Sequence, residues 1–351
     1  MNIFNATIEH RGTLMIRWLL IGVLLSGLLT SFVAGATTFK IATLSPDGSS
    51  WMKAMRSAAA DVHEATQGRV KFKFYPGAVM GDDKVVLRRM RLGALQGAAL
   101  TAGSLTSAYT DVQLYNLPMV FRDLDEVDYV RKRLDRRLMA GLSANGYEAL
   151  GFAEVGFAYA MSSVLVTSVA DARGLKVWVP DGDPGTQRTA EAFGIAPIPL
   201  TIADVLAGLQ TGLINAVTIP PIGAVALQWH TQLDYVLDVP LLYVFGTMVI
   251  TNSSFSKLAE VDQETVRRLV GAALARIDAQ SRADHESALA ALQQQGLKLV
   301  RPGVDELSEW QSSADAATAR MLEKGVVTQL GYDELRRYLR EYRSGAEMPA
   351  E

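Results

Sequence analysis

Short runs of alternating apolar and polar residues recur along this chain, and stretches with helical spacing separate them. Residues 39–43 alternate and predict a first strand. A helix capped by Ser49 or Ser50 and ended by Gly68 follows, because its apolar residues recur every three or four positions. Residues 70–74 alternate again and predict a second strand. This order of strand, helix and strand is typical of an α/β domain.

A second α/β pattern lies in the middle of the chain. Thr201 and Asp204 have the spacing of a capping box, and Gly212 suits the end of that helix. Two such units joined by extended segments predict an α/β fold of two lobes with a cleft between them. The second unit comprises residues 175–180, 184–193, 197–200, 201–209 and 214–219.

One predicted helix is much longer than the others. Residues 262–295 contain no proline and a single glycine, Gly271, and Val266, Val270 and Ile277 fall on one face. About 34 helical residues extend roughly 50 Å at 1.5 Å per residue. We therefore expect this helix to span both lobes.

The N-terminal residues have the pattern of an export signal. Arg11 and Arg17 precede an uncharged stretch, residues 18–36, whose apolar centre is short for a membrane span. Ala34-Gly35-Ala36 fits cleavage before the next residue, so residues 1–36 are predicted to be a cleavable signal peptide. An uncleaved anchor is the alternative, and Met15 is an alternative start.

Composition narrows the possible chemistry. The chain has 351 residues, a formal net charge of −3 and no cysteine. The absence of cysteine excludes disulfides, thiolate metal sites and cysteine nucleophiles. The mild charge gives no indication of nucleic-acid binding. A basic run from Arg131 to Arg137 is expected to form a solvated helix face.

No sequence motif of an enzyme is present. The chain lacks a Gly-x-Gly-x-x-Gly, Walker A, His-Glu-x-x-His or Gly-x-Ser-x-Gly pattern, and its histidines are far apart. The segment from Asp181 to Gly185 resembles a calcium loop only superficially, and we expect a tight turn that caps the next helix. No catalytic residue, metal ligand or cofactor is predicted, and an enzyme is not the favoured class.

Four segments of the sequence, through their order and spacing along the chain, resemble the DctP-type periplasmic receptors of tripartite ATP-independent periplasmic (TRAP) transporters. They are Phe74-Tyr75-Pro76-Gly77, Met80-Gly81-Asp82-Asp83, residues 117–121, and residues 174–212. The resemblance implies two α/β lobes, hinge strands and closure over a ligand. It also implies a location in the periplasm and delivery of the ligand to membrane permease subunits. By this resemblance residues 37–155 plus 249–285 form lobe I, and residues 156–248 plus 286–351 form lobe II.

The ligand-contacting positions depart from the pattern of that family. An arginine that pairs with a substrate carboxylate usually stands where this sequence has Trp178. A second arginine often stands at the position of Ala158, and the usual asparagine is replaced by Ile219. We therefore expect a ligand site formed by Trp178, Ala158, Ile219, Leu44, Trp51, Met80, Thr101, Phe157 and Ile202.

These replacements predict a neutral or hydrophobic ligand, because a buried carboxylate without a cation is poorly compensated for its desolvation. The alternative is an ordinary receptor for organic acids in which Arg173 or Arg188 substitutes for the missing arginine. A further alternative is a ligand sensor or carrier that docks on a periplasmic partner built of helical repeats. No nucleic-acid partner is expected.

Overall fold

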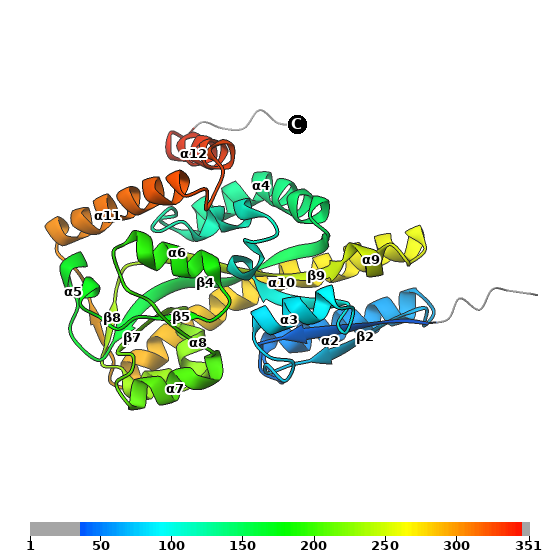
Figure 1. The fold of residues 1–351 in the computed structure, drawn as a ribbon, viewed down its shortest axis with the longest axis horizontal. Coiled ribbons are helices and arrows are strands. Elements are labelled where there is room, and N and C mark those ends of the chain that lie inside the picture. Colours follow the sequence, from blue (N-terminus) through cyan, green and yellow to red (C-terminus); the bar gives the residue numbers. More distant parts are fainter. Residues whose placement is uncertain (1–35, 346–351) are drawn as a thin grey trace, which may run out of the picture. The chain divides into compact units, whose positions relative to one another are not determined.

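The computed structural model describes residues 36–345, and within them strands and helices alternate along the chain (Figure 1). The predicted signal peptide lies outside the described residues, apart from Ala36. The strands are β1 (Thr37–Thr43), β2 (Val70–Tyr75), β3 (Gly97–Thr101), β4 (Tyr147–Ser162), β5 (Trp178–Pro180), β6 (Ile198–Leu200), β7 (Ala216–Ile219), β8 (Tyr235–Leu237), β9 (Leu242–Thr251) and β10 (Lys298–Val300).

The helices cover the strands and connect them. The α-helices are α2 (Ser50–Ala65), α3 (Asp83–Arg91), α4 (Leu124–Ala144), α5 (Val169–Arg173), α6 (Pro184–Ala192), α7 (Ile202–Gln210), α8 (Pro221–Ala226), α9 (Asn252–Phe255), α10 (Glu260–Gln294), α11 (Val304–Glu323) and α12 (Gln329–Arg343). The 3₁₀-helices are η1 (Ala102–Leu105), η2 (Thr110–Asn116) and η3 (Trp229–Gln232). The strands and helices predicted from the periodicity of residues 39–74 and 175–219 are confirmed, with boundaries shifted by a few residues.

Strand β4 is shared by two sets of strands. The order of the main sheet is β10-β8-β4-β9-β3-β1-β2, and β7 also pairs with β4. Residues 147–158 of β4 pair antiparallel with β9, whereas Tyr159 to Ser162 pair with β7 and, at the end, with β8. The pairing with β9 shifts between Glu154 and Gly156, and Gly156 has a φ of 117°. This irregularity, where β4 changes partners, is typical of a β-bulge.

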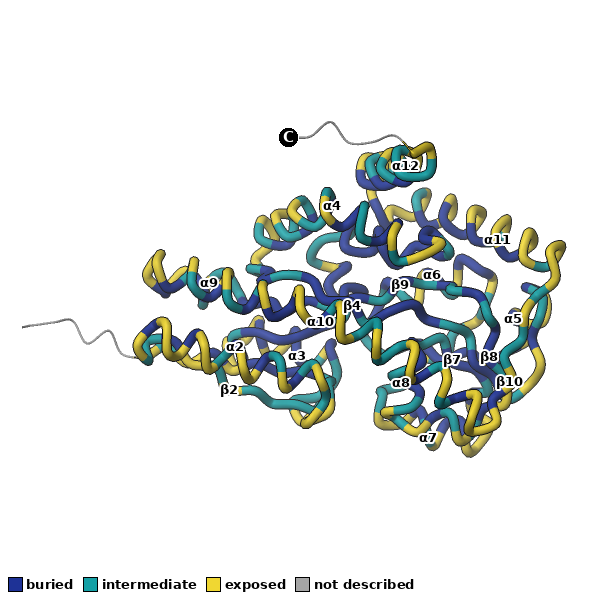
Figure 2. Tube along the Cα trace, turned by 180° about the vertical axis from the view of Figure 1, so that it is seen from behind, coloured by how far each residue is buried: buried dark blue, intermediate teal, exposed yellow. Residues whose placement is uncertain are grey.

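Helix α10 is the long helix that the sequence predicts. It spans 35 residues and begins two positions before the predicted start. Val266, Val270 and Ile277 are buried in an apolar cluster with β1, α2 and β9, whereas Leu289 and Leu292 contact a different cluster with α7 and α8. Figure 2, seen from the opposite side to Figure 1, shows α10 running along β4 and β9, which are themselves mostly buried. The helix therefore contacts both halves of the sheet.

The C-terminal helices connect different parts of the fold. Trp310 of α11 donates a hydrogen bond from Nε1 to the Thr167 carbonyl oxygen (2.8 Å), next to α5. Helix α12 instead packs on α4, where Arg343 forms an ion pair with Glu126 (2.7 Å). Among the described residues, 38–345 group as one unit. The division into two lobes by residue range stays an expectation, in which α12 and α4 belong to different lobes.

The expectation of a solvated face for residues 131–137 is wrong for Arg131. Its side chain is buried, and its guanidinium contacts Asp135 (3.2 Å) and Asp278 (2.8 Å). It also donates hydrogen bonds to the Phe152 carbonyl oxygen (3.1 Å) and the Tyr243 hydroxyl (3.2 Å). The periodicity of one helix cannot reveal this burial, because β4, β9 and α10 supply the partners.

A second arginine completes this buried ionic network. Arg282 of α10 contacts Asp128 of α4 (2.6 Å) and Glu154 of β4 (2.9 Å). The backbone N–H of Glu154 donates to Asp278 Oδ1 (2.6 Å), and Ser281 Oγ donates to the Glu154 carbonyl oxygen (2.8 Å). The network fixes α4 and α10 to β4 just before the bulge at Gly156.

Candidate ligand-binding site

Strand β5 carries the position that the sequence singles out. It pairs in parallel with β6, so Trp178 lies opposite Ile198 and Pro180 opposite Leu200. Because side chains alternate across a strand, Val177 and Trp178 enter different apolar clusters. The face of β5 that holds Trp178 packs toward α7 and η3, not toward α6.

The Trp178 side chain is buried and its polar atom is satisfied. Only 5% of the residue is exposed, and Nε1 donates a hydrogen bond to the Leu200 carbonyl oxygen (3.0 Å). The ring meets Trp229 edge to face, with centroids 4.9 Å apart and planes at 78°. We call the buried set around them the Trp178 cluster. It comprises Met161, Trp178, Val205, Leu209, Ile214, Val217, Ala224, Trp229, Leu233, Val236, Leu292 and Leu297.

The structure brings part of the predicted site together at this cluster. Ile202 and Ile219 are partly buried and pack against it, as does Tyr159, which lies opposite Ile219 in the β4–β7 ladder. Ala158, the residue before Tyr159, is fully buried on β4 opposite Leu242. These residues form an apolar wall that contains no charged side chain.

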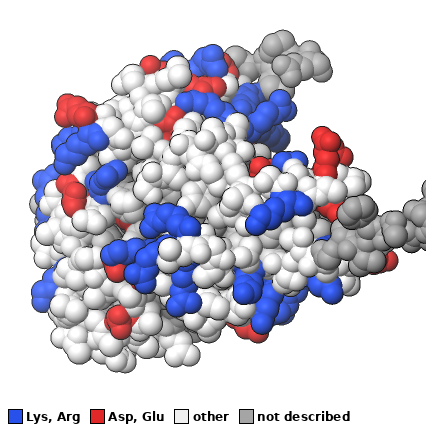
Figure 3. All heavy atoms as spheres, turned by 45° about the vertical axis from the view of Figure 1, so that its right-hand side comes forward, with Lys and Arg blue, Asp and Glu red and all other residues white. Residues whose placement is uncertain are grey.

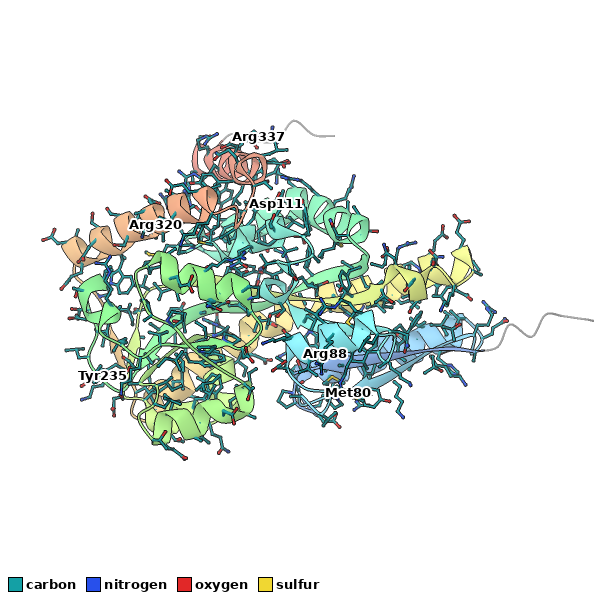
Figure 4. The ribbon with its side chains drawn as sticks, in the orientation of Figure 1. Met80, Arg88, Asp111, Tyr235, Arg320 and Arg337 are labelled. Carbon is teal, nitrogen blue, oxygen red and sulfur yellow. The ribbon has the colours of Figure 1, made fainter. Side chains whose placement is uncertain are left out.

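The other predicted residues belong to separate clusters. Phe157 packs edge to face on Tyr243 (5.7 Å), and Trp51 packs on the cluster around β1 and α2. Met80 is partly buried in the loop before α3, and Figure 4 shows it on the same side of the molecule as Arg88, far from Tyr235. Leu44 is partly buried at the end of β1. The structure gives no contact between these four residues and Trp178.

Neither candidate substitute arginine is directed toward Trp178 by its contacts. Arg173 Nε donates a hydrogen bond to the Phe193 carbonyl oxygen (3.1 Å), at the C-terminal end of α6. Arg188 is exposed on α6. Two cavities, one beside α2 and one beside α12, are lined by residues other than the predicted ligand-contacting ones.

Sequence reasoning missed a pair of buried acids near Thr101. Asp83 begins α3, is 5% exposed, and accepts hydrogen bonds from Thr101 (3.2 Å) and Ser104. Asp183 is equally buried and caps α6 through the Thr186 N–H (2.9 Å). This confirms the predicted capping turn after β5. A Cβ atom at Gly103 would overlap the Asp183 carboxylate, so a glycine is needed where η1 meets this turn.

The motif Met80-Gly81-Asp82-Asp83 could have drawn attention to Asp83, but only the fold shows that it is buried beside Asp183. Burial and the nearby Asp183 charge raise the pKa of Asp83 to about 6, although hydrogen bonds from Ser104 and Thr101 lower it. A group of this kind favours protonation and disfavours a second negative charge close by.

The burial of Asp83 should make the free energy of unfolding depend on pH. The folded state holds the Asp83 proton up to a pH of about 6, whereas the unfolded carboxyl releases it near pH 3.8. The contribution of Asp83 to the free energy of unfolding therefore falls as pH rises through this range, by at most about 3 kcal/mol. We expect Asp83→Asn to remove this component and to stabilise the protein by about 1–3 kcal/mol at pH 8.

Urea unfolding of the two proteins from pH 4 to pH 8 measures the difference. Asp181→Asn is the matched control, because it changes a neighbouring and more exposed carboxylate, 3.7 Å from the Lys84 ammonium. That variant should keep the wild-type pH profile. Parallel profiles for wild type and Asp83→Asn would contradict the prediction.

In the part of the chain that the structure describes, we find no metal centre and no helix that could span a membrane. Between residues 36 and 345, no group of three His, Cys, Asp or Glu side chains is placed to hold a metal ion. None of the helices in that range combines the length and the apolar composition needed to cross a bilayer.

The fold is that of the periplasmic receptors of TRAP transporters. A Bordetella pertussis extracytoplasmic solute receptor binding pyroglutamic acid superposes with a TM-score of 0.79 at 18% identity, over 87% of this chain and all of that one. A TRAP periplasmic solute binding protein from Sulfurospirillum deleyianum with bound succinate gives 0.76 at 20% identity, covering 87% and 98%. The predicted two-lobed α/β class is confirmed.

Residues 41–325 match the family described as bacterial extracellular solute-binding protein, family 7, and the chain belongs to this family of receptors. The sialic acid-binding periplasmic protein SiaP of Vibrio cholerae is 24% identical over 68% of this chain and 74% of its own. The 2,3-diketo-L-gulonate-binding periplasmic protein YiaO of Escherichia coli is 28% identical, over 44% of this chain and 48% of its own.

Proposed function

We propose that this chain is the periplasmic receptor of a TRAP transporter and delivers a small organic molecule to membrane permease subunits. Its family membership and fold support this role. We further propose that the ligand is neutral or largely apolar and binds against Trp178, Ile202 and Ile219. The remaining predicted contacts, Leu44, Trp51, Met80, Thr101, Phe157 and Ala158, complete this site when the lobes close.

One observation carries the proposal on the ligand: Trp178, where the family resemblance leads us to expect a carboxylate-binding arginine, is a buried indole whose N–H is already bonded to the Leu200 carbonyl oxygen. A carboxylate placed here would lose its hydration without gaining a cation, which costs several kcal/mol. Apolar ligand surface would gain about 25 cal/mol for each Å² removed from water.

The buried acids support the same conclusion for the part of the proposed site that contains Thr101. Asp83 and Asp183 lie with Thr101 and Ser104 where η1 meets the turn before α6. Their negative charges disfavour a further anion within a short distance, since like charges are weakly screened in a buried environment.

A receptor for organic acids is the second candidate, and the ligands named for the relatives favour it. Pyroglutamic acid, succinate and sialic acid all carry carboxylates. In that case Arg188 is the better-placed substitute, because the guanidinium of Arg173 is already bonded to Phe193. Docking on a helical-repeat partner in place of a permease would suit either ligand class.

Isothermal titration calorimetry separates the two candidates. The wild-type protein should not bind succinate or sialic acid, and native mass spectrometry of protein purified without denaturation should show a bound neutral molecule. Trp178→Arg should gain some affinity for a monocarboxylate and bind the neutral ligand more weakly, with circular dichroism to check that this change at a buried position leaves the protein folded; Trp178→Phe should retain the wild-type preference. Micromolar binding of succinate to the wild-type protein would refute the neutral-ligand proposal and leave the receptor assignment intact.

A further inference from the structure

A separate cavity lies away from the Trp178 cluster. It has a volume of about 50 Å³ and is bounded by the connection from η2 to α4, by α11 and by α12. About 10–15 Å³ suffices for one water molecule, so this cavity has room for a small polyatomic ligand. Helix α12 lies beyond residues 41–325, so one wall is outside the part that matches the family.

Three guanidinium groups reach this cavity from two of its walls. Arg343 is neutralised, because its Nε and Nη2 atoms bond both carboxylate oxygens of Glu126 (2.7 and 2.8 Å) and Nη2 also donates to the Val120 carbonyl oxygen. Arg122 and Arg336 form no ion pair with any carboxylate in residues 36–345. Asp315 is the acid on the cavity wall, and it is exposed. Among the residues that line the cavity, arginines therefore outnumber acids by three to one, although Glu126 and Asp123 lie close to Arg122 and Arg343.

Neutral hydrogen-bond donors line the same cavity. Thr318 is only 7% exposed, and Tyr332 is partly buried. Across the described residues, neither hydroxyl takes part in a hydrogen bond with the protein. Two guanidinium groups and two hydroxyl groups thus converge without acceptors, which is the donor set that oxyanions and carboxylates require.

The backbone at the cavity wall is also unusual. Met119 has a φ of 47°, in the left-handed region that a methionine rarely adopts. Its N–H donates to the Leu241 carbonyl oxygen (2.8 Å), which holds the loop in place. Backbone strain of this kind is concentrated at functional sites, and Met119 lies in the segment that carries Arg122.

We propose that this cavity is a second binding site, which takes a small free anion such as a monocarboxylate or inorganic phosphate. Arg122 and Arg336 supply the charge, and Thr318 and Tyr332 supply hydroxyl donors. Figure 3 shows Lys and Arg side chains gathered at the top of the view, the side on which Figure 1 places α12, and these would attract an anion to this part of the surface. The proposal does not depend on which ligand binds at Trp178.

The test is titration of the purified protein with inorganic phosphate and, separately, with acetate at constant ionic strength, measured by NMR and by the thermal unfolding midpoint. At least one anion should bind the wild-type protein in the millimolar range. Arg336→Gln and Arg122→Gln should each weaken this binding about tenfold, the effect of losing one hydrogen bond between charged groups. Arg336→Lys, which keeps the charge, should lie between wild type and Arg336→Gln.

Arg340→Gln is the matched control, because Arg340 is exposed on α12 and does not line the cavity. It should leave anion binding unchanged. No binding of either anion to the wild type, or an equal loss in Arg340→Gln and Arg336→Gln, would overturn the proposal. Sedimentation with phosphatidylglycerol vesicles that requires Arg336, without binding of either free anion, would overturn it in favour of a lipid headgroup.

Discussion

Replacing Arg131 by methionine is expected to lower the free energy of unfolding by about 3–5 kcal/mol, the range for breaking a buried ion pair from one side. The substitution keeps much of the apolar stem but removes the guanidinium that contacts Asp135 and Asp278. Both carboxylates then remain partly buried without this cation, and the Phe152 carbonyl oxygen loses a donor. Urea unfolding followed by circular dichroism at pH 7.5 measures the loss.

Arg136→Met is the matched control on the same helix. Arg136 is exposed and makes no ion pair within residues 36–345, so its replacement should change the free energy of unfolding by less than about 0.5 kcal/mol. A similar loss of unfolding free energy in the two variants would mean that a methionine destabilises α4 on either face, and that the loss in Arg131→Met does not come from the ionic network. A loss below 1 kcal/mol for Arg131→Met would contradict the assigned role of the network.

Replacing Trp178 by alanine is expected to cost about 3–5 kcal/mol of stability, because it removes a large side chain from a packed cluster and leaves a cavity. The Leu200 carbonyl oxygen also loses the indole N–H, and Trp229 loses its edge-to-face partner. Thermal and urea unfolding give the loss, and Trp178→Phe should retain part of the stability because a ring remains.

A double-mutant cycle with Trp229→Ala isolates the ring contact. The coupling between the two tryptophans should be about 0.5–1.5 kcal/mol, as for other aromatic pairs. A parallel cycle between Trp229 and Trp51 is the control, since Trp51 packs on a different cluster and its effect should add to within about 0.5 kcal/mol. Equal coupling energies in the two cycles would contradict the prediction, because they would show that the coupling does not come from the contact between the Trp178 and Trp229 rings.

Much of the fold follows from local patterns. The helical stripe of α10 identifies that helix because one face is buried and the other is solvated. The alternation in residues 39–43 identifies β1, although only Lys40 is exposed there and Ala42 is buried. The packing of α12 on α4 does not follow in this way. It depends on pairs such as Arg343 with Glu126, which are more than two hundred positions apart in the chain. Likewise, only the sheet order shows that β4 pairs with two sets of strands.

The candidate site shows the same limit. The position of Trp178 could be found from neighbouring prolines and glycines, and Ile202 and Ile219 pack on the same apolar cluster, while their contact with a ligand stays a prediction. The sequence could not show that the indole is buried against Trp229, because the face of a three-residue strand is decided by the helices beside it. The burial of Asp83 was equally hidden, since it results from the approach of η1 and α6.

The pairing of β4 with two sets of strands limits how the receptor can be divided into fragments. One 16-residue strand supplies hydrogen-bonding edges to β9 on one stretch and to β7 and β8 on the next. A fragment that ends within β4 leaves one half without its central strand and exposes an unpaired edge. Neither half is thus a self-contained module that recombination could exchange intact.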